Sequence, residues 1–259
     1  MRKLILAVVS LLALLVIVDF GAAAYSEYRV SRALRAGGEL TADPSVTITG
    51  FPFLTQAASG KYSNVEIRAQ DVNSNVVGEV TVEANLRGVR IPMSDLIDGT
   101  VTTVPVDHLD GRVLIDATEL GTFLGIPDLQ VSAPPADRSD GTGGSGGSGM
   151  TTSGGVVLTG TVPVGPVRAS VSVQADLVLD GSNVKVVATD LYFGPEGRVD
   201  FTVPQVLKPT VLGLFTRTID SQQLPFGVVP NKVYAEGSQL VIEGAGENVV
   251  IGLDELQTP

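Results

Sequence analysis

Residue types that commonly carry chemistry are missing or scarce in this chain of 259 residues, which contains no cysteine, no tryptophan and one histidine, His108. Without cysteine there can be no disulfide, no thiolate metal ligand and no cysteine nucleophile. A single histidine also argues against a zinc site, which normally takes several histidine or cysteine ligands. We therefore expect no metal ion and no cofactor.

Positive charge is scarce as well. The 17 lysine and arginine residues are outnumbered by 28 aspartate and glutamate residues, so the formal net charge is −11. A nucleic-acid-binding protein needs a basic surface to neutralise phosphates, and this composition excludes that class of function. The acidic surplus keeps a protein soluble and weakens purely electrostatic attraction to anionic lipid headgroups.

A catalytic constellation is also missing. His108 has acidic neighbours in Asp107 and Asp110, but adjacent side chains on a strand point to opposite faces, so Asp107 is poorly placed to orient the imidazole. A G-x-S-x-G pattern at residues 143–147 lies in low-complexity sequence instead of a strand-to-helix turn. We expect a protein that is not an enzyme. The alternative is a carboxylate-dependent hydrolase using Asp107 and Asp110, whose separation the sequence does not define.

The N-terminus has the order of a secretory signal. Arg2 and Lys3 precede an apolar run from Leu4 to Val18, and the small residues 21–24 follow. This pattern predicts cleavage at the end of the small-residue segment. As a helix, the apolar run would span about 22 Å, which is short of the roughly 30 Å hydrocarbon core of a bilayer.

The same segment is compatible with an uncleaved anchor. If Asp19 is tolerated, residues 4–24 are long enough to span a membrane. We favour the cleaved signal peptide because the apolar run is short, and we keep the N-terminal membrane anchor as the alternative. Under either interpretation, the positive-inside rule keeps Arg2 and Lys3 in the cytoplasm. Residues 25–259 are then exported to the periplasmic side of the plasma membrane, within the cell envelope.

Strands dominate the exported part. Alternating apolar and polar residues predict strands of an antiparallel sheet that has one wet face. The segments with this alternation are 64–69, 80–87 and 170–180, and a hairpin is expected from 232–236 and 239–243, joined around Gly237. Something apolar must cover the other face of such a sheet.

Helices are predicted in three places. A short helix is expected from Tyr25 to Ala36, and a second at 116–124, with a capping box between Asp116 and Glu119. The third, at 203–215, has a single apolar stripe and contains Pro209, which should kink it. Together with the strands, these helices predict an α+β fold.

A segment rich in glycine and serine separates the two strand-rich halves. It reads DRSDGTGGSGGSGMTTSGG and runs from Asp137 to Gly155. Such a composition cannot bury enough apolar surface to order itself, so we predict a flexible insert. We favour a mobile loop within one domain, residues 25–259, over a linker between two domains.

The stretch GFPFLTQAASGKYSNVEI, residues 50–67, places Phe51, Phe53 and Leu54 around a proline. One hypothesis is an apolar tip, held out of the sheet by Pro52, that touches a bilayer or closes the mouth of a cavity. The other is that both phenylalanines belong to an ordinary core. The one-sided strands leave the same choice between a closed core and an acyl-chain tunnel, because both use the same residues.

Three segments resemble the actinobacterial LmeA-like family, named for lipomannan elongation factor A: TITGFPFLTQAASGKYSNVEI, AAAYSEYRVSRAL and LPFGVVPNKVYAEGSQLVIEGAGENVVI. The resemblance covers most of the exported chain, apart from the Gly/Ser insert. It implies a cell-envelope protein that binds phospholipid, including the phosphatidylinositol type, and supports lipomannan elongation. It also implies a strongly bent antiparallel sheet wrapped around one or two helices, as in tubular lipid-binding (TULIP-like) domains, and it carries over no catalytic residues.

We therefore predict a non-enzymatic phospholipid-binding protein at the outer face of the plasma membrane, with acyl chains held in an apolar cavity. Burial of a handful of methylene groups is enough for micromolar binding without a charged headgroup clamp. A protein that scaffolds glycosyltransferases is the alternative. The predicted lipid-binding residues are Phe51, Phe53, Leu54, Val65, Ile67, Val80, Val82, Val171, Val173, Leu207, Val211, Leu214 and Phe215.

Overall fold

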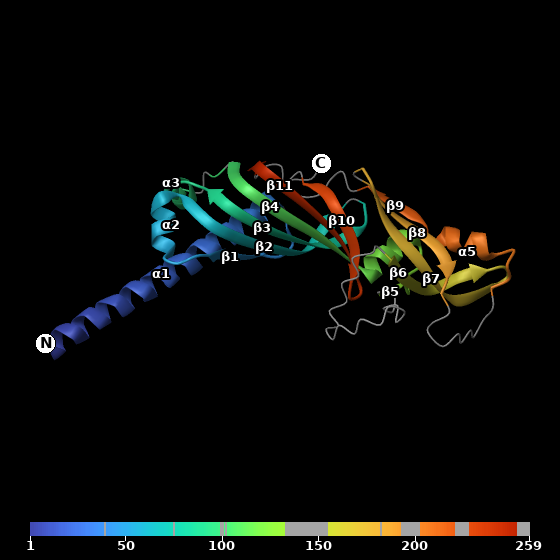
Figure 1. Ribbon diagram of the computed structural model, residues 1–259, viewed down its shortest axis with the longest axis horizontal. Helices are drawn as coiled ribbons and strands as arrows, with labels where there is room; N and C mark the ends of the chain where they lie inside the picture. Colours follow the sequence, from blue (N-terminus) through green and yellow to red (C-terminus); the bar gives the residue numbers. More distant parts are fainter. Residues whose placement is uncertain are drawn as a thin grey trace, which may run out of the picture.

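The computed structural model describes residues 1–38, 40–74, 76–98, 101, 103–132, 155–181, 183–192, 203–220 and 228–252. Of the insert predicted at 137–155, only Gly155 falls in these ranges, and it begins a strand. The predicted α+β class is confirmed. Two antiparallel sheets follow one another along an elongated molecule, and a long N-terminal helix projects from one end (Figure 1).

The first sheet has six strands in the order β1-β2-β3-β4-β11-β10. Their bounds are β1 Ser45–Thr49, β2 Lys61–Ser74, β3 Gly78–Arg90, β4 Thr103–Asp116, β10 Val229–Glu236 and β11 Gln239–Gly252. Strands β1 to β4 form a meander, and β11 pairs with β4 from Gln239 opposite Asp116 to Gly252 opposite Thr103. The predicted C-terminal hairpin is thereby confirmed, and it completes a sheet begun by the N-terminal half.

The second sheet has five strands in sequence order. Their bounds are β5 Gln130–Ser132, β6 Gly155–Val164, β7 Val167–Asp180, β8 Asn183–Leu191 and β9 Arg217–Asp220. The alternation predicted from sequence is seen in both sheets. On β3, for example, Val80, Val82, Ala84 and Leu86 are buried, and the residues between them are at least partly exposed.

Five helices occur in the described part of the chain: α1 Arg2–Gly37, α2 Phe53–Ser59, α3 Met93–Asp98, α4 Ala117–Leu124 and α5 Lys208–Leu214. The helix predicted at 25–36 is not a separate element, because it is the C-terminal part of α1. Residues 2–37 contain no proline, so nothing in the sequence interrupts the hydrogen-bond ladder between the apolar segment and the exported one.

Two helix predictions need correction. The helix expected at 203–215 begins only at Lys208, which puts Pro209 in its first turn, because proline is tolerated there but not in a helix interior. The helix after Asp116 is confirmed, but the capping box is wrong. Asp116 accepts a hydrogen bond from the Gln239 amide at 2.6 Å, and Glu119 accepts one from the Glu79 backbone N–H at 3.4 Å.

The apolar residues form two clusters. The α1 cluster joins one end of the first sheet to α1 and α2, and consists of Leu34, Val46, Phe53, Ala57, Tyr62, Val65, Ala84, Leu86, Val89, Val104, Val106, Leu109, Val228 and Ile251. The junction cluster joins the other end of that sheet to α4, α5 and the second sheet, and includes Val80, Val82, Ile115, Leu120, Leu158, Val171, Val173, Val211, Phe215 and Leu240. Strand β3 contributes to both clusters, so the two ends of the molecule share one framework.

Candidate lipid-binding cavity

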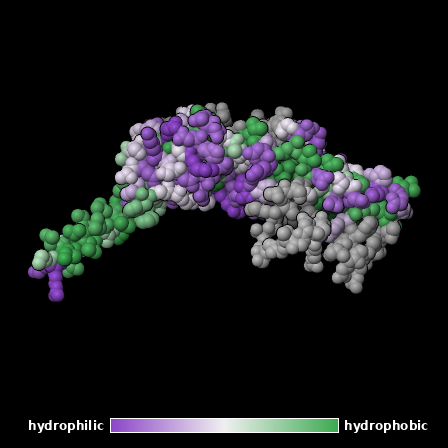
Figure 2. Space-filling view, in the orientation of Figure 1, coloured by the Kyte–Doolittle hydropathy of each residue, from purple (hydrophilic) through white to green (hydrophobic). Residues whose placement is uncertain are grey.

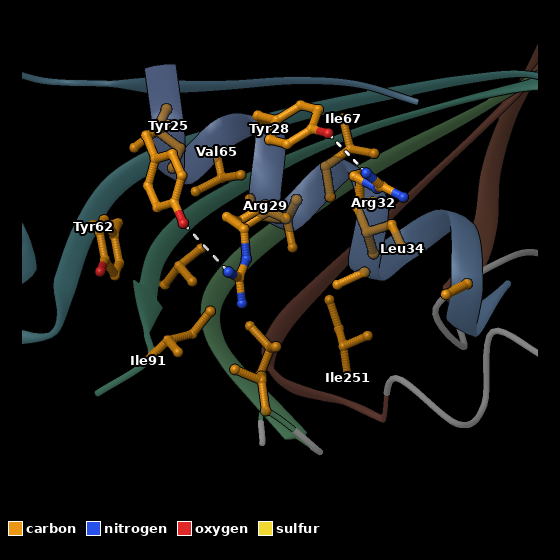
Figure 3. Close-up of a pocket in the computed structure, with 18 residues that line it drawn as sticks. Tyr25, Tyr28, Arg29, Arg32, Leu34, Tyr62, Val65, Ile67, Ile91 and Ile251 are labelled. Atoms are coloured by element: carbon orange, nitrogen blue, oxygen red, sulfur yellow. Dashed lines mark hydrogen bonds between the residues drawn. The ribbon is translucent and has the colours of Figure 1, made fainter. Parts of the chain in front are cut away.

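A cavity of about 640 Å³ lies between the C-terminal part of α1 and the first sheet (Figure 3). Its volume falls within the roughly 300–1,000 Å³ typical of ligand pockets. The apolar lining comes from α1, β1 to β4 and β11, with single residues between strands: Val30, Ala33, Leu34, Ala36, Ile48, Val65, Ile67, Leu86, Val89, Ile91, Val101, Val104 and Ile251. Such a lining suits a hydrocarbon chain better than a polar ligand.

Strand register and helix spacing explain why these side chains meet. Val65 on β2 is paired with Leu86 on β3, so their side chains lie next to each other on the same face of the sheet. On α1, Val30, Ala33 and Leu34 are spaced three and four residues apart and therefore share one helix face. The helix lies across an apolar sheet face without filling the space above it.

Two tyrosine–arginine pairs lie on α1 where the cavity opens. Arg29 donates a hydrogen bond to the Tyr25 hydroxyl at 3.3 Å, and Arg32 donates one to the Tyr28 hydroxyl at 2.8 Å (Figure 3). The Arg32 guanidinium also lies 5.7 Å from the centre of the Tyr28 ring. The hydrogen bond that Arg32 donates to the Tyr28 hydroxyl raises the pKa of Arg32 further above its ordinary value. Guanidinium groups in such positions can bind a phosphate group.

Tyr62 adds a polar group to the cavity wall. Its side chain is 2% exposed and packs against Phe53 with ring centres 6.1 Å apart. Its hydroxyl has no hydrogen-bond partner within the described ranges, and burial raises its pKa. A buried hydroxyl without a partner costs free energy, and a ligand's ester or hydroxyl oxygen would satisfy it.

The structure separates the predicted lipid-binding residues into groups. Val65 and Ile67 line the cavity. The other strand and helix positions lie in or against the junction cluster: Val80, Val82, Val171, Val173, Leu207, Val211, Leu214 and Phe215. Val173, on β7, and Phe215, at the end of α5, are fully buried there. Any contact of this second group with lipid stays a prediction.

The residues around Pro52 do not share one environment either. The segment expected as a loop contains the start of α2, at Phe53. Phe53 is 3% exposed and belongs to the α1 cluster, whereas Phe51 and Leu54 are 65% and 37% exposed. Phe51 stacks against Phe20 of α1 at 6.1 Å between ring centres. The core hypothesis therefore holds for Phe53, and contact of Phe51 and Leu54 with a bilayer stays a prediction.

Sequence reasoning missed the polar side chains of the cavity. Tyr25, Tyr28, Arg29 and Arg32 form two pairs with a spacing of four residues, and this spacing is a readable signal because such residues are neighbours on a helix. No local signal marks Tyr62, whose importance depends on what the fold leaves beside its hydroxyl.

The acidic residues considered for hydrolysis are engaged by basic partners. Asp107 binds Arg90 and Asp110 binds Arg87, and the Nε2 atom of His108 lies 3.2 Å from an Asp110 oxygen. All these side chains are substantially exposed on the first sheet. Within the described residues, no group of three or more histidine, cysteine, aspartate or glutamate side chains could hold a metal ion.

A family model described as LmeA-like phospholipid-binding matches residues 17–245. No curated protein and no solved structure matches the chain. The match includes the second half of α1, the first sheet up to the middle of β11, and every cavity-lining residue except Ile251. The chain therefore belongs to the LmeA-like phospholipid-binding family.

Proposed function

We propose that this protein binds a phospholipid at the outer face of the plasma membrane, with an acyl chain of the lipid in the cavity between α1 and the first sheet. The protein does not change the lipid chemically. The observation that carries this proposal is the cavity itself, which has an apolar lining, four polar side chains on α1 and the Tyr62 hydroxyl on β2. Lipid handling that supports lipoglycan elongation is the cellular role implied by the family resemblance.

The apolar lining is sufficient for useful affinity. Burying about ten methylene groups at about 0.8 kcal/mol each contributes about 8 kcal/mol, which corresponds to micromolar binding before ordering costs. No charged group lies among the residues contributed by the sheet strands. The acyl chain of the lipid would be held only by the burial of its apolar surface.

Headgroup recognition is assigned to α1. Arg29 and Arg32 are three residues apart and therefore lie on one side of the helix, close enough to bind one phosphate group together. This arrangement adds a charged clamp to the burial of the acyl chain. It favours anionic phospholipids, among them the phosphatidylinositol type, although the net charge of the protein is negative.

Blocking the cavity tests the proposal. We expect the full-length wild type, purified in a detergent that contains no phospholipid, to release phospholipid on solvent extraction and mass spectrometry. Ala33→Trp places an indole in the cavity and should reduce the bound lipid at least several-fold. Ala42→Trp, at an exposed position outside the lining, should leave it unchanged.

The proposal would be abandoned if the wild type emerged free of lipid and also failed to take up labelled phospholipid from vesicles. Equal lipid content in Ala33→Trp and Ala42→Trp would place the lipid elsewhere on the molecule. Catalysis would become the better explanation if the bound lipid were recovered as a cleavage product.

A further inference from the structure

Helix α1 continues through the position where the sequence predicts cleavage. It runs without interruption from Arg2 to Gly37, and cleavage after Ala24 would cut it in two. The part before Ala24 carries exposed apolar side chains from Leu4 to Phe20, which form the projecting apolar arm in Figure 2, with hydrophilic residues at its tip. The part after Ala24 lines the cavity.

Asp19 breaks the apolar character of this arm and has a structural reason to be there. It is 5% exposed, and its two carboxylate oxygens accept hydrogen bonds from the backbone N–H groups of Phe53 and Leu54, both at 2.8 Å. These are the first N–H groups of α2, which have no acceptor within their own helix. Pro52, at the N-cap position, has no side-chain acceptor to offer. The acceptor therefore comes from α1.

Other residues before Ala24 also contact the exported fold. The Phe20 ring stacks on Phe51, and Ala22 and Ala23 pack against the α1 cluster. Cleavage after Ala24 would remove all these contacts and leave two N–H groups of α2 without their acceptor. A signal peptide that is discarded has no need for such contacts with the mature protein.

We propose that α1 is retained after export as a membrane anchor, and that the exposed side chains of Phe20, Phe51 and Leu54 rest on the outer leaflet. Residues 4–18 span about 22 Å as a helix, and the rest of the roughly 30 Å hydrocarbon core is covered when residues 19–24 and the apolar side chains of Phe51 and Leu54 beside them lie in the outer leaflet. Arg2 and Lys3 then lie on the cytoplasmic side, as the positive-inside rule requires. Of the described helices, α1 alone is long and apolar enough to cross a membrane.

The anchor fixes the cavity next to the membrane. Tyr25, the first cavity residue on α1, directly follows the membrane-spanning segment, and Tyr28 and Arg29 lie one turn further along. A phospholipid of the outer leaflet could then enter the cavity while its headgroup stays near these residues. This consequence rests on the proposed function, whereas retention of α1 rests only on the contacts of Asp19, Phe20 and the two alanines.

Intact mass and membrane extraction test the retention. We expect the full-length chain, carrying a C-terminal tag and isolated from the membranes of an exporting bacterial host, to have a mass that includes residues 1–24. It should stay in the pellet after alkaline carbonate extraction. A mass that corresponds to a chain beginning near Tyr25, or release into the alkaline supernatant, would overturn the proposal.

The two proposals fail separately in this experiment. A cleaved, extractable protein that still carries phospholipid would overturn the anchor and support the cavity. An anchored protein that carries none would support the anchor and overturn the cavity.

The role of Asp19 is tested in the full-length chain by amide hydrogen exchange. Asp19→Ala should make the Phe53 and Leu54 amides exchange about tenfold faster, because they lose their acceptor. The matched control is Asp43→Ala, which removes a half-exposed carboxylate paired with Arg35 at 3.2 Å and should change these amides little. Equal exchange in Asp19→Ala and wild type would show that α2 does not depend on the anchor segment.

Discussion

Arg29 and Arg32 are held ready for a ligand, because each binds the hydroxyl of the tyrosine one turn earlier on α1. A long flexible side chain loses rotamer freedom when it binds, and a group already positioned loses less. The two tyrosines therefore act as positioning residues for the guanidinium groups. At the cavity, the guanidinium groups can donate charge-assisted hydrogen bonds to a phosphate oxygen.

Replacing both arginines should change lipid preference. We expect Arg29→Gln with Arg32→Gln to lower the affinity for vesicles containing anionic phospholipid by about tenfold or more, because each charge-assisted hydrogen bond contributes about 1.5–3 kcal/mol. Affinity for purely zwitterionic phospholipid should change much less. Uptake of labelled anionic and zwitterionic phospholipid by the full-length protein, kept in detergent, measures both.

A double variant on the same sheet provides the control. Arg87 and Arg90 follow the cavity-lining residues Leu86 and Val89 on β3 but are exposed and bound to aspartates. Arg87→Gln with Arg90→Gln removes the same net charge away from the cavity. If it weakened binding as much as the α1 variant did, recognition would be a matter of overall charge and not of the two α1 side chains.

Helix α2 is a short element with two different faces. Phe53 packs in the α1 cluster, where it meets Tyr62, while the next residue, Leu54, is exposed. Phe51, two residues before the helix, is also exposed and stacks on Phe20. The sequence FPFL shows that apolar residues are concentrated here, but the start of the helix decides which of them is buried. An apolar tip and a core anchor are thus combined within four residues.

Single replacements should separate these two roles. Phe53→Ser is expected to lower the free energy of unfolding by about 3–5 kcal/mol, because it removes a buried aromatic ring and leaves a cavity. Phe51→Ser should cost less than about 1.5 kcal/mol, the range of an aromatic pair, while weakening contact with the membrane surface. Chemical denaturation in detergent and fluorescence quenching by lipid probes measure the two effects. Equal destabilisation by the two substitutions would show that Phe51 also belongs to the core.

Several elements were predictable from local pattern and others were not. The strands could be predicted because a one-sided sheet imposes a period of two on the sequence, as β3 shows. The start of α5 was misplaced because the apolar stripe begins before Pro209, and the stripe does not record where proline permits a helix to begin. The continuity of α1 was missed because the small residues after Asp19 are compatible both with a signal-peptide cleavage site and with a helix that continues.

At the scale of the molecule, the long strands of the first sheet connect two packed regions. Strand β3 supplies Leu86 to the α1 cluster and Val80 to the junction cluster, and β4 supplies Leu109 and Ile115 in the same way. Helix α4 lies at the junction, where it contacts β3, β4 and β5. A substitution that destabilises one cluster should therefore also destabilise the other through the shared strands.

This framework predicts one unfolding transition for residues 25–259, as expected for a single domain. Phe215→Ala in the junction cluster and Phe53→Ser in the α1 cluster should each shift the same calorimetric transition of the full-length protein downward, because both clusters share strands. Two separated peaks, each sensitive to only one of the variants, would indicate two domains. Exposed Val178→Ala serves as the control and should leave the transition nearly unchanged.

The sequence alone determined the fold class, the strands, the apolar N-terminal segment and the family, because composition, short-range periodicity and motifs are local properties. It could not decide which apolar residues surround a cavity. The alternation that places Val65 on an apolar face also places Val173 on one. Helix α1 leaves open space beside Val65, whereas Val173 is enclosed in the junction cluster by residues of α4, α5 and both sheets. Only the tertiary structure also shows why Asp19 interrupts the apolar run, because its partners Phe53 and Leu54 lie more than thirty residues away along the chain.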